Sequence, residues 1–182
     1  MDDLGLTLWL YLALIALVIV QRLVELAVSR RNQQRLEARG ARQVGGGHYP
    51  AMVALHTAFL AACVLEPLLL DRPFVPLLAG PMLALLVLAT GVRYWAISTL
   101  GDRWTTRVFV LPGSPPVAAG PYRFVAHPNY LAVVVEVAAL PLVHTAWLTA
   151  LVFTLANAIL LTVRIRVEER ALAQMRAGGG GR

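Results

Sequence analysis

Residues 120–142, GPYRFVAHPNYLAVVVEVAALPL, join a polar turn to an apolar run. The polar half holds a Gly-Pro pair, an arginine, a His-Pro pair and two tyrosines. Proline suits the first turn of a helix, so the His-Pro pair predicts a helix start at that point. The apolar part, about Tyr130 to Leu142, is shorter than the roughly 20 residues that a membrane-crossing helix needs. The stretch therefore predicts a short helix, tilted or partly crossing, with polar groups clustered at its foot.

Longer apolar stretches lie on both sides of this short one. Helices are predicted over about residues 4–28, 50–70, 74–100 and 146–167, and the last of these forms a tight hairpin with the short helix. The chain is 58% hydrophobic and 14% charged, whereas soluble domains carry roughly 25% charged residues. The predicted fold class is an all-α integral membrane protein with about five transmembrane helices, forming a single domain over residues 1–182. The first stretch has no basic segment before it, so we expect a retained span and not a cleaved signal peptide.

The distribution of basic residues predicts an orientation in the membrane. All 16 basic side chains are arginines, and only Arg72 lies in the link between the second and third apolar stretches. The others follow the first stretch, separate the third from the fourth, or follow the inner end of the fifth. The protein is predicted to lie in the cell (inner) membrane. Because basic residues accumulate on the cytosolic side, its N-terminus is predicted to lie outside the cell and its C-terminus in the cytosol. Membrane topology thus accounts for the net charge of +6, and nucleic acid is not an expected partner.

Two polar segments share the predicted cytosolic face. Residues 101–129 are broken by several prolines and glycines, which predicts a shaped loop or a short hairpin in place of a continuous helix. The tail from about residue 164 places Arg164 and Glu168 four positions apart on one helix face. From the spacing alone, a surface ion pair that anchors the helix end is favoured, and a binding site is the alternative.

Taken together, these motifs resemble a known family. The chain contains these motifs in a fixed order: Gly120-Pro121-Tyr122-Arg123, His127-Pro128-Asn129-Tyr130, a hydrophobic hairpin, Arg164, and Glu168-Glu169-Arg170-Ala171-Leu172. This order resembles the isoprenylcysteine carboxyl methyltransferase family of membrane enzymes, with residues 98–172 as the motif-bearing catalytic region. Residues 48–66, HYPAMVALHTAFLAACVLE, further resemble a bacterial branch similar to alkylpyrone and alkylresorcinol methyltransferases.

The resemblance implies transfer of a methyl group from S-adenosylmethionine to an oxygen of a lipophilic acceptor. The acceptor would be a polyketide hydroxyl of the alkylpyrone or alkylresorcinol kind, or a prenylcysteine-like carboxylate. Two alternatives stay open. An NADPH-dependent membrane reductase of the sterol-reductase type has a related C-terminal region but usually more spans, and a non-enzymatic small membrane subunit would not need the histidine and carboxylate cluster.

The resemblance also implies a set of cofactor-binding residues. His127 and Tyr130 belong to the cofactor site in the family, and Glu168 and Glu169 close the same site from the last helix. The full predicted cofactor set is Tyr122, Arg123, His127, Asn129, Tyr130, Glu168 and Glu169. As an alternative, Tyr122 and Tyr130 are aromatic residues of the membrane interface. The family usually has an arginine before the His-Pro pair, where this chain has Ala126. Either Arg123 takes its place, or the carboxylate of the cofactor is held differently.

Ionisable groups within the predicted spans mark further candidates, because charge is costly at membrane depth. Glu136 is predicted to act on the acceptor side as a base, together with Arg164 as a catalytic residue; its alternative is a structural hydrogen bond to His56 or to a neighbouring helix. His56 is predicted to bind substrate, and Glu66 is expected near the membrane interface. Cys63, the single cysteine, is predicted to be a small buried hydrophobe, and no metal site is expected.

Overall fold

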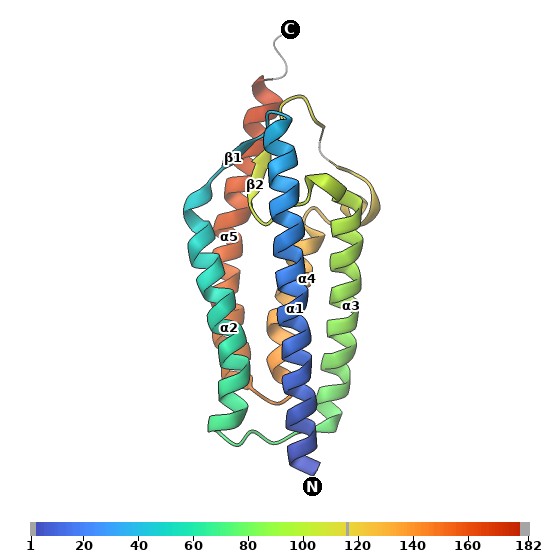
Figure 1. The fold of residues 1–182 in the computed structure, drawn as a ribbon, viewed down its shortest axis with the longest axis vertical. Coiled ribbons are helices and arrows are strands. Elements are labelled where there is room, and N and C mark those ends of the chain that lie inside the picture. Colours follow the sequence, from blue (N-terminus) through green and yellow to red (C-terminus); the bar gives the residue numbers. More distant parts are fainter. Residues whose placement is uncertain (1–2, 116, 179–182) are drawn as a thin grey trace.

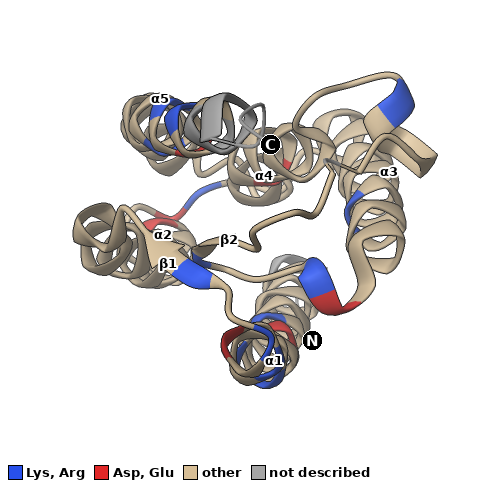
Figure 2. Cartoon of the chain, turned by 90° about the horizontal axis from the view of Figure 1, so that it is seen from above, with Lys and Arg blue, Asp and Glu red and all other residues tan. Residues whose placement is uncertain are grey.

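Five helices stand side by side in the computed structural model, which describes residues 3–115 and 117–178 (Figure 1). The helices are α1 (Asp3–Ala38), α2 (Tyr49–Leu69), α3 (Pro76–Leu100), α4 (Pro128–Leu142) and α5 (Trp147–Gly178). Two short strands, β1 (Arg42–Val44) and β2 (Val108–Val110), and three 3₁₀ turns, η1 (Gly46–His48), η2 (Gly101–Arg103) and η3 (Gly120–Arg123), complete the described elements. Seen from above, α4 lies between α3 and α5 (Figure 2).

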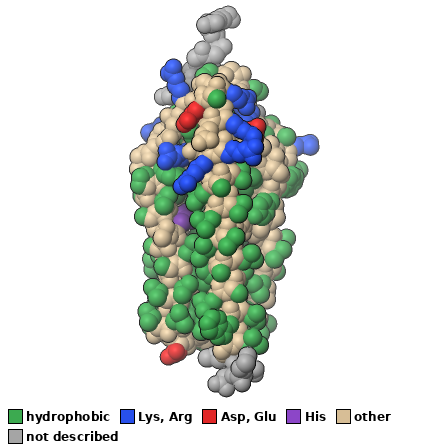
Figure 3. All heavy atoms as spheres, viewed as in Figure 1, with side chains coloured by type: hydrophobic (Ala, Val, Ile, Leu, Met, Phe, Trp, Pro, Cys, Tyr) green, Lys and Arg blue, Asp and Glu red, His purple; other side chains and the backbone are tan. Residues whose placement is uncertain are grey.

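Length and composition allow four helical stretches to cross a membrane: Gly5–Ala38, Gly46–Leu69, Pro76–Arg103 and Trp147–Ala171. The helix α4, Pro128–Leu142, is apolar but shorter. Hydrophobic side chains cover most of the length of the visible face, and arginine side chains gather at the end that carries the strands (Figure 3). The predicted class, an all-α integral membrane protein, is therefore confirmed; of the about five transmembrane helices expected, four are long enough to span a membrane and α4 is shorter. We call the end with β1, β2 and the start of α4 the sheet end.

Both α1 and α5 continue well past the apolar stretches that predicted them. Residues 29–38, SRRNQQRLEA, extend α1 beyond the predicted end near Val28. Arginine, glutamine, glutamate and leucine are favourable helix residues, so the helix has no reason to end where the hydropathy falls. The extension carries α1 beyond its own apolar part, where it lies beside the polar segment that follows α3.

The two strands form an antiparallel pair with Arg42 opposite Val110 and Val44 opposite Val108. The sequence allowed a short hairpin within residues 101–129, but β2 instead pairs with residues that precede α2. Prolines at positions 112 and 115 follow β2, and proline offers no N–H group for a returning strand. This pairing ties the α1–α2 link to the α3–α4 segment.

The apolar core fills the half of the bundle away from the sheet end. Its buried members are Tyr11, Ile15, Val18, Phe59, Cys63, Leu86, Val137, Ala139, Leu140 and Val143. Cys63 is buried there as a free thiol, in agreement with the sequence interpretation.

The carboxylate of Glu66 caps the start of α5. It accepts hydrogen bonds from the backbone N–H groups of Leu148 and Thr149 and from the Thr149 hydroxyl, and it pairs with Arg72 at 2.9 Å. A carboxylate at a helix N-terminus satisfies free N–H groups and complements the helix dipole. Glu66 lies near the end of its helix and is buried; its place at the membrane interface stays a prediction.

Four charged side chains form one network between α1, α3 and α4. Glu25 binds Arg93 through two contacts, of 2.9 and 2.6 Å, and also binds Arg22 at 2.6 Å. Arg22 in turn places Nη2 at 2.8 Å from both carboxylate oxygens of Glu136. Two positive and two negative groups balance, so the network brings no net charge among the apolar helices. We refer to Arg22, Glu25, Arg93 and Glu136 as the ion quartet.

Removal of Glu25 should destabilise the fold strongly. The Glu25→Ala variant leaves the buried Arg93 without its carboxylate partner and the half-buried Arg22 with Glu136 alone, and breaking a buried pair in this way costs about 3–5 kcal/mol. Denaturant-dependent unfolding in detergent micelles measures the change in the free energy of unfolding. The matched control is Arg35→Ala, which breaks the exposed Arg35–Asp102 pair and should cost about 1 kcal/mol or less. Equal effects of both substitutions would contradict a stabilising role for the ion quartet.

We expect the sheet end to face the cytosol, because the arginines gather there. A reporter fused after Arg182 should be cytosolic, and one fused before Leu4 should be external. Paired fusions to alkaline phosphatase, which is active outside, and to a fluorescent protein that matures inside measure both ends. The reverse pattern would show that the arginine distribution does not orient this chain.

Candidate functional site

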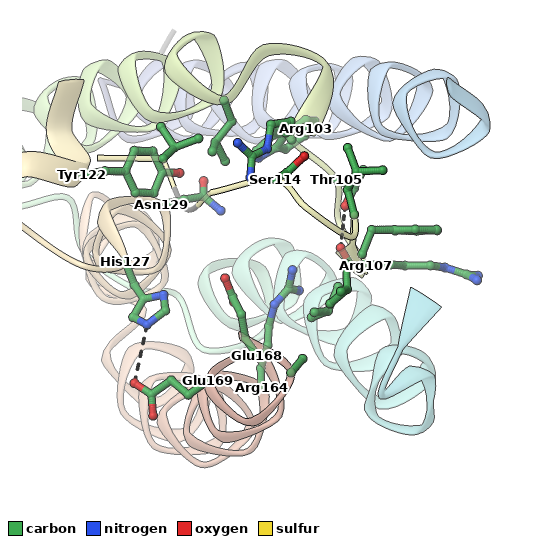
Figure 4. Close-up of a pocket in the computed structure, with 18 of the residues that line it drawn as sticks. Arg103, Thr105, Arg107, Ser114, Tyr122, His127, Asn129, Arg164, Glu168 and Glu169 are labelled. Carbon is green, nitrogen blue, oxygen red and sulfur yellow. Dashed lines mark hydrogen bonds and ion pairs between the residues drawn. The ribbon is translucent and has the colours of Figure 1, made fainter. Parts of the chain in front are cut away.

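A pocket of about 560 Å³ opens at the sheet end between the segment after α3, the start of α4 and the last turns of α5 (Figure 4). Its lining includes Leu36, Leu100, Arg103, Trp104, Thr105, Arg107, Val108, Ser114, Tyr122, Ala126, His127, Asn129, Tyr130, Arg164, Glu168 and Glu169. The size is that of a site for a small molecule or cofactor. The lining mixes ionisable groups with apolar and aromatic side chains.

Tyr130 connects the two helices that form one wall. Its hydroxyl donates a hydrogen bond to the carboxylate of Glu168 and accepts one, 2.8 Å long, from Nε of Arg164. The Arg164 guanidinium lies 5.2 Å from the centre of the Tyr130 ring and also contacts Sδ of Met52 at 3.1 Å. The spacing of Arg164 and Glu168 allowed a direct ion pair, but the phenol joins the two instead. Since Arg164 is buried, this arrangement holds both charges in fixed positions.

His127 immediately precedes α4, and Pro128 occupies the first turn of that helix, as the sequence predicted. A residue before proline avoids the helical conformation, so His127 stands off the helix and its side chain reaches toward α5. Its ring stacks on Tyr130 with centroids 5.1 Å apart. Its Nε2 lies 3.9 Å from Oε1 of Glu169. The histidine therefore bridges the start of α4 and the acidic end of α5.

Tyr122 and Asn129 offer hydrogen-bonding groups to the same pocket. Burial, followed by the negative charge of Glu168, raises the pKa of Tyr122 to about 12. Its phenol consequently stays protonated at neutral pH and acts as a donor. The buried Oδ1 of Asn129 has no hydrogen-bond partner among the described residues, which leaves an acceptor free at the pocket wall.

The opposite wall comes from residues that carry no recognisable motif, and the sequence did not reveal them. Trp104 is buried, and its carbonyl accepts a 2.8 Å hydrogen bond from Asn32 of α1. Arg103 donates to the carbonyl of Pro115 at 2.9 Å. Arg107 donates to Gln43 at 3.0 Å and stacks over Tyr49, 4.5 Å from the ring centre. Arg103 and Arg107, two arginines within a proline-rich segment, were the sequence feature that could have indicated this wall. The sequence analysis used them only to predict the membrane topology.

Three predicted site residues lie outside the lining of this pocket. Arg123 is exposed on η3. Glu136 binds Arg22 in the ion quartet, so its contact is to a neighbouring helix, as the structural alternative allowed, although the partner is not His56. The Nδ1 of His56 lies 2.8 Å from the carbonyl of Met52, and the ring lines a small crevice with Phe59 and Asn157. Tyr122, His127, Asn129, Tyr130, Arg164, Glu168 and Glu169 do share the pocket.

Comparison with known proteins assigns the class to which this bundle and pocket belong. The model of the isoprenylcysteine carboxyl methyltransferase (ICMT) family matches residues 82–174, a range that includes both polar walls of the pocket. The chain belongs to the ICMT family, and it is thus a membrane protein of a methyltransferase family.

Two relatives match along nearly their whole length. The chain is 40% identical over 161 residues to the uncharacterized protein YpbQ of Bacillus subtilis (strain 168), covering 88% of this chain and 95% of that one. It is 30% identical over 161 residues to an uncharacterized protein of Haemophilus influenzae (strain ATCC 51907 / DSM 11121 / KW20 / Rd), covering 88% and 93%. No solved structure matches the chain.

Proposed function

We propose that this protein transfers the methyl group of S-adenosylmethionine to an oxygen of a lipophilic acceptor that partitions into the membrane. One observation carries the proposal: seven of the predicted site residues within the ICMT match converge on one pocket at the arginine-rich end of an apolar bundle. A polar donor reaches such a pocket from water, and a lipophilic acceptor reaches it from the bilayer. In this proposal residues 98–172 form the catalytic region of a single domain.

The side chains of the pocket suit the chemical groups of the proposed donor. Carboxylates at Glu168 and Glu169 accept hydrogen bonds from ribose hydroxyls or pair with the ammonium group. An imidazole N–H of His127 and the free Oδ1 of Asn129 add a donor and an acceptor. When bound, S-adenosylmethionine supplies an electrophilic methyl group on a positively charged sulfur.

The protein's own contribution is then placement and exclusion of water, because methyl transfer is an in-line displacement that depends on geometry. Tyr130 keeps Arg164 and Glu168 in fixed positions, and the stacked His127 limits the motion of the Tyr130 ring. In this proposal Arg164, a fixed buried cation, acts beside the reacting oxygen. The buried indole of Trp104 helps to exclude water on the opposite side.

For the acceptor we propose an alkylpyrone-like or alkylresorcinol-like hydroxyl, or a prenylcysteine-like carboxylate. All of these carry an apolar tail that stays among lipid chains while the polar head meets the pocket. The inner membrane, with the pocket on the cytosolic side, is the proposed location. The predicted roles of Arg123 in cofactor binding and of His56 in acceptor binding remain proposals.

Substitutions on the two sides of the pocket should weaken cofactor binding. His127→Ala and Glu168→Ala should each cost about 1–3 kcal/mol in the binding of S-adenosylhomocysteine, since each removes a charge-assisted hydrogen bond in a partly buried site. Isothermal titration of the purified protein in detergent measures both. The exposed Arg39 supplies the control, and Arg39→Gln should bind as the unchanged protein does.

NADPH is titrated in parallel with the unchanged protein. Binding of NADPH without binding of S-adenosylhomocysteine would favour the reductase alternative. Binding of neither would leave the methyltransferase proposal without its cofactor. Full affinity in both variants, with the fold intact, would show that the motif residues do not hold the cofactor.

Glu136 is the proposed acceptor-side base, and its pairing with Arg22 allows a sharp test. Glu136→Gln should lower turnover of a 5-alkylresorcinol about 100-fold or more, in the range typical of a general base, while affinity for S-adenosylhomocysteine stays the same. Turnover is measured by transfer of a radiolabelled methyl group. The matched variant Arg22→Gln breaks the same ion pair but keeps the carboxylate, so it should retain much more activity. Equal losses in both variants would reduce Glu136 to a structural partner of Arg22.

A further inference from the structure

The pocket carries opposite charges on opposite walls. Glu168 and Glu169 project from α5 on one side, next to His127 (Figure 4). Arg103 lies across the pocket, beside Ser114 and on the side of Tyr122 (Figure 4). A ligand that fills the space between these walls meets anionic groups at one edge and a cation at the other. Such a division favours a zwitterionic ligand held in one orientation.

Three arginines line the pocket, and their contacts differ. Arg164 is buried and held by the Tyr130 hydroxyl, by Sδ of Met52 and by the Tyr130 ring, next to the charge of Glu168. Its positive charge is thus largely used within the protein. Arg107 is directed outward, where it stacks over Tyr49 and binds Gln43.

The side chain of Arg103 makes fewer contacts than those of Arg164 and Arg107. Among the described residues, the Arg103 side chain makes one hydrogen bond, from Nη2 to the carbonyl of Pro115. A guanidinium carries five N–H donors in a planar fork, so several remain to bind a ligand. A backbone carbonyl also leaves the positive charge of Arg103 unneutralised.

The start of α4 and the turn before it bring no arginine to the described lining of the pocket. Ala126 lines the pocket with a methyl group, and Arg123 on η3 is exposed and outside the lining. Arg103 is therefore the arginine that faces the pocket with its charge free.

This inference rests on the proposed function: we propose that Arg103 binds the carboxylate of the methyl donor, while Glu168 and Glu169 face its ammonium and ribose groups. A guanidinium and a carboxylate match in shape and form paired, charge-assisted hydrogen bonds. The arrangement separates the two charged ends of the amino-acid part across the pocket. The donor is thereby oriented from both ends before any acceptor arrives.

The test compares two ligands that differ in that amino-acid part. S-Adenosylhomocysteine carries the carboxylate and the ammonium, whereas 5′-methylthioadenosine keeps the adenosine and the thioether but lacks both. Arg103→Gln should weaken binding of S-adenosylhomocysteine about 10–100-fold, as expected when a charged hydrogen bond is lost. Binding of 5′-methylthioadenosine should change by less than about twofold, within the usual scatter of surface substitutions. Isothermal titration with the purified full chain in detergent gives all four affinities.

Two further variants control the comparison. Arg103→Lys keeps the charge but not the planar fork, so it should recover part of the lost affinity for S-adenosylhomocysteine; if Arg103→Gln does not fold, the selectivity of the lysine variant decides. Arg39→Gln removes an exposed arginine outside the pocket lining and should leave both ligands unaffected.

The outcomes separate the inference from the function on which it rests. Failure of the unchanged protein to bind S-adenosylhomocysteine would overturn the proposed function. Normal binding with an equal loss for both ligands in Arg103→Gln, or with no loss for either, would overturn the role of Arg103 alone. A selective loss in Arg123→Gln in place of Arg103→Gln would assign the carboxylate to η3. If Arg103→Gln binds S-adenosylhomocysteine normally but no longer turns over a carboxylate acceptor, Arg103 binds the acceptor and not the donor.

Discussion

Two guanidinium groups and two carboxylates bind one another between α1, α3 and α4, at a depth where the neighbouring side chains are apolar. An unpaired charge is costly in that surrounding, so each of the three helices must keep the rotation and height at which its charge meets a partner. The constraint matters most for α4, which is too short to be fixed by spanning a membrane. Glu136 holds α4 to Arg22, and two turns toward the sheet end, about 10 Å at 1.5 Å per residue, Asn129 and Tyr130 enter the pocket. Together with the packing of buried α4 side chains such as Ala132 and Leu140, the ion quartet thus fixes the height of the pocket wall.

The second wall depends on the extension of α1 beyond the apolar layer. Asn32 donates to the carbonyl of Trp104, and the Ser29 hydroxyl accepts a hydrogen bond from the backbone N–H of Thr106. Together with the β1–β2 pair, these bonds fix a proline-rich segment that has few internal hydrogen bonds of its own. Arg103 and Arg107 take their positions from this support. The helix that looks like a simple membrane anchor therefore contributes to both walls, through the quartet on one side and through Ser29 and Asn32 on the other.

The layout also suits the two ligands of the proposed function, one soluble in water and one in the membrane. Polar and charged groups line the pocket at the sheet end, while hydrophobic side chains cover the rest of the visible face. Membership of the ICMT family gives this division a chemical meaning, since a methyl donor is polar and the proposed acceptor is a lipid. The bridge from the buried Arg164 through Tyr130 to Glu168 forms part of the pocket lining. In the proposed function, this bridge lies where the head of the acceptor would meet the donor.

Hydropathy and local motifs were sufficient to predict the helical membrane class and the short fourth helix that begins at Pro128, and the family resemblance of the motifs implied seven residues that share the pocket. These properties depend on neighbours in the chain: an apolar run needs a helix to satisfy its backbone in lipid, and proline after histidine starts one locally. The tertiary structure alone decided that Glu136 binds Arg22 and not His56, that Arg123 faces away while Arg103 faces inward, and that β2 pairs with residues before α2. Each of these contacts joins segments far apart in the sequence. Their partners are set by how the helices rotate and pack against one another, and no local pattern of residues records that.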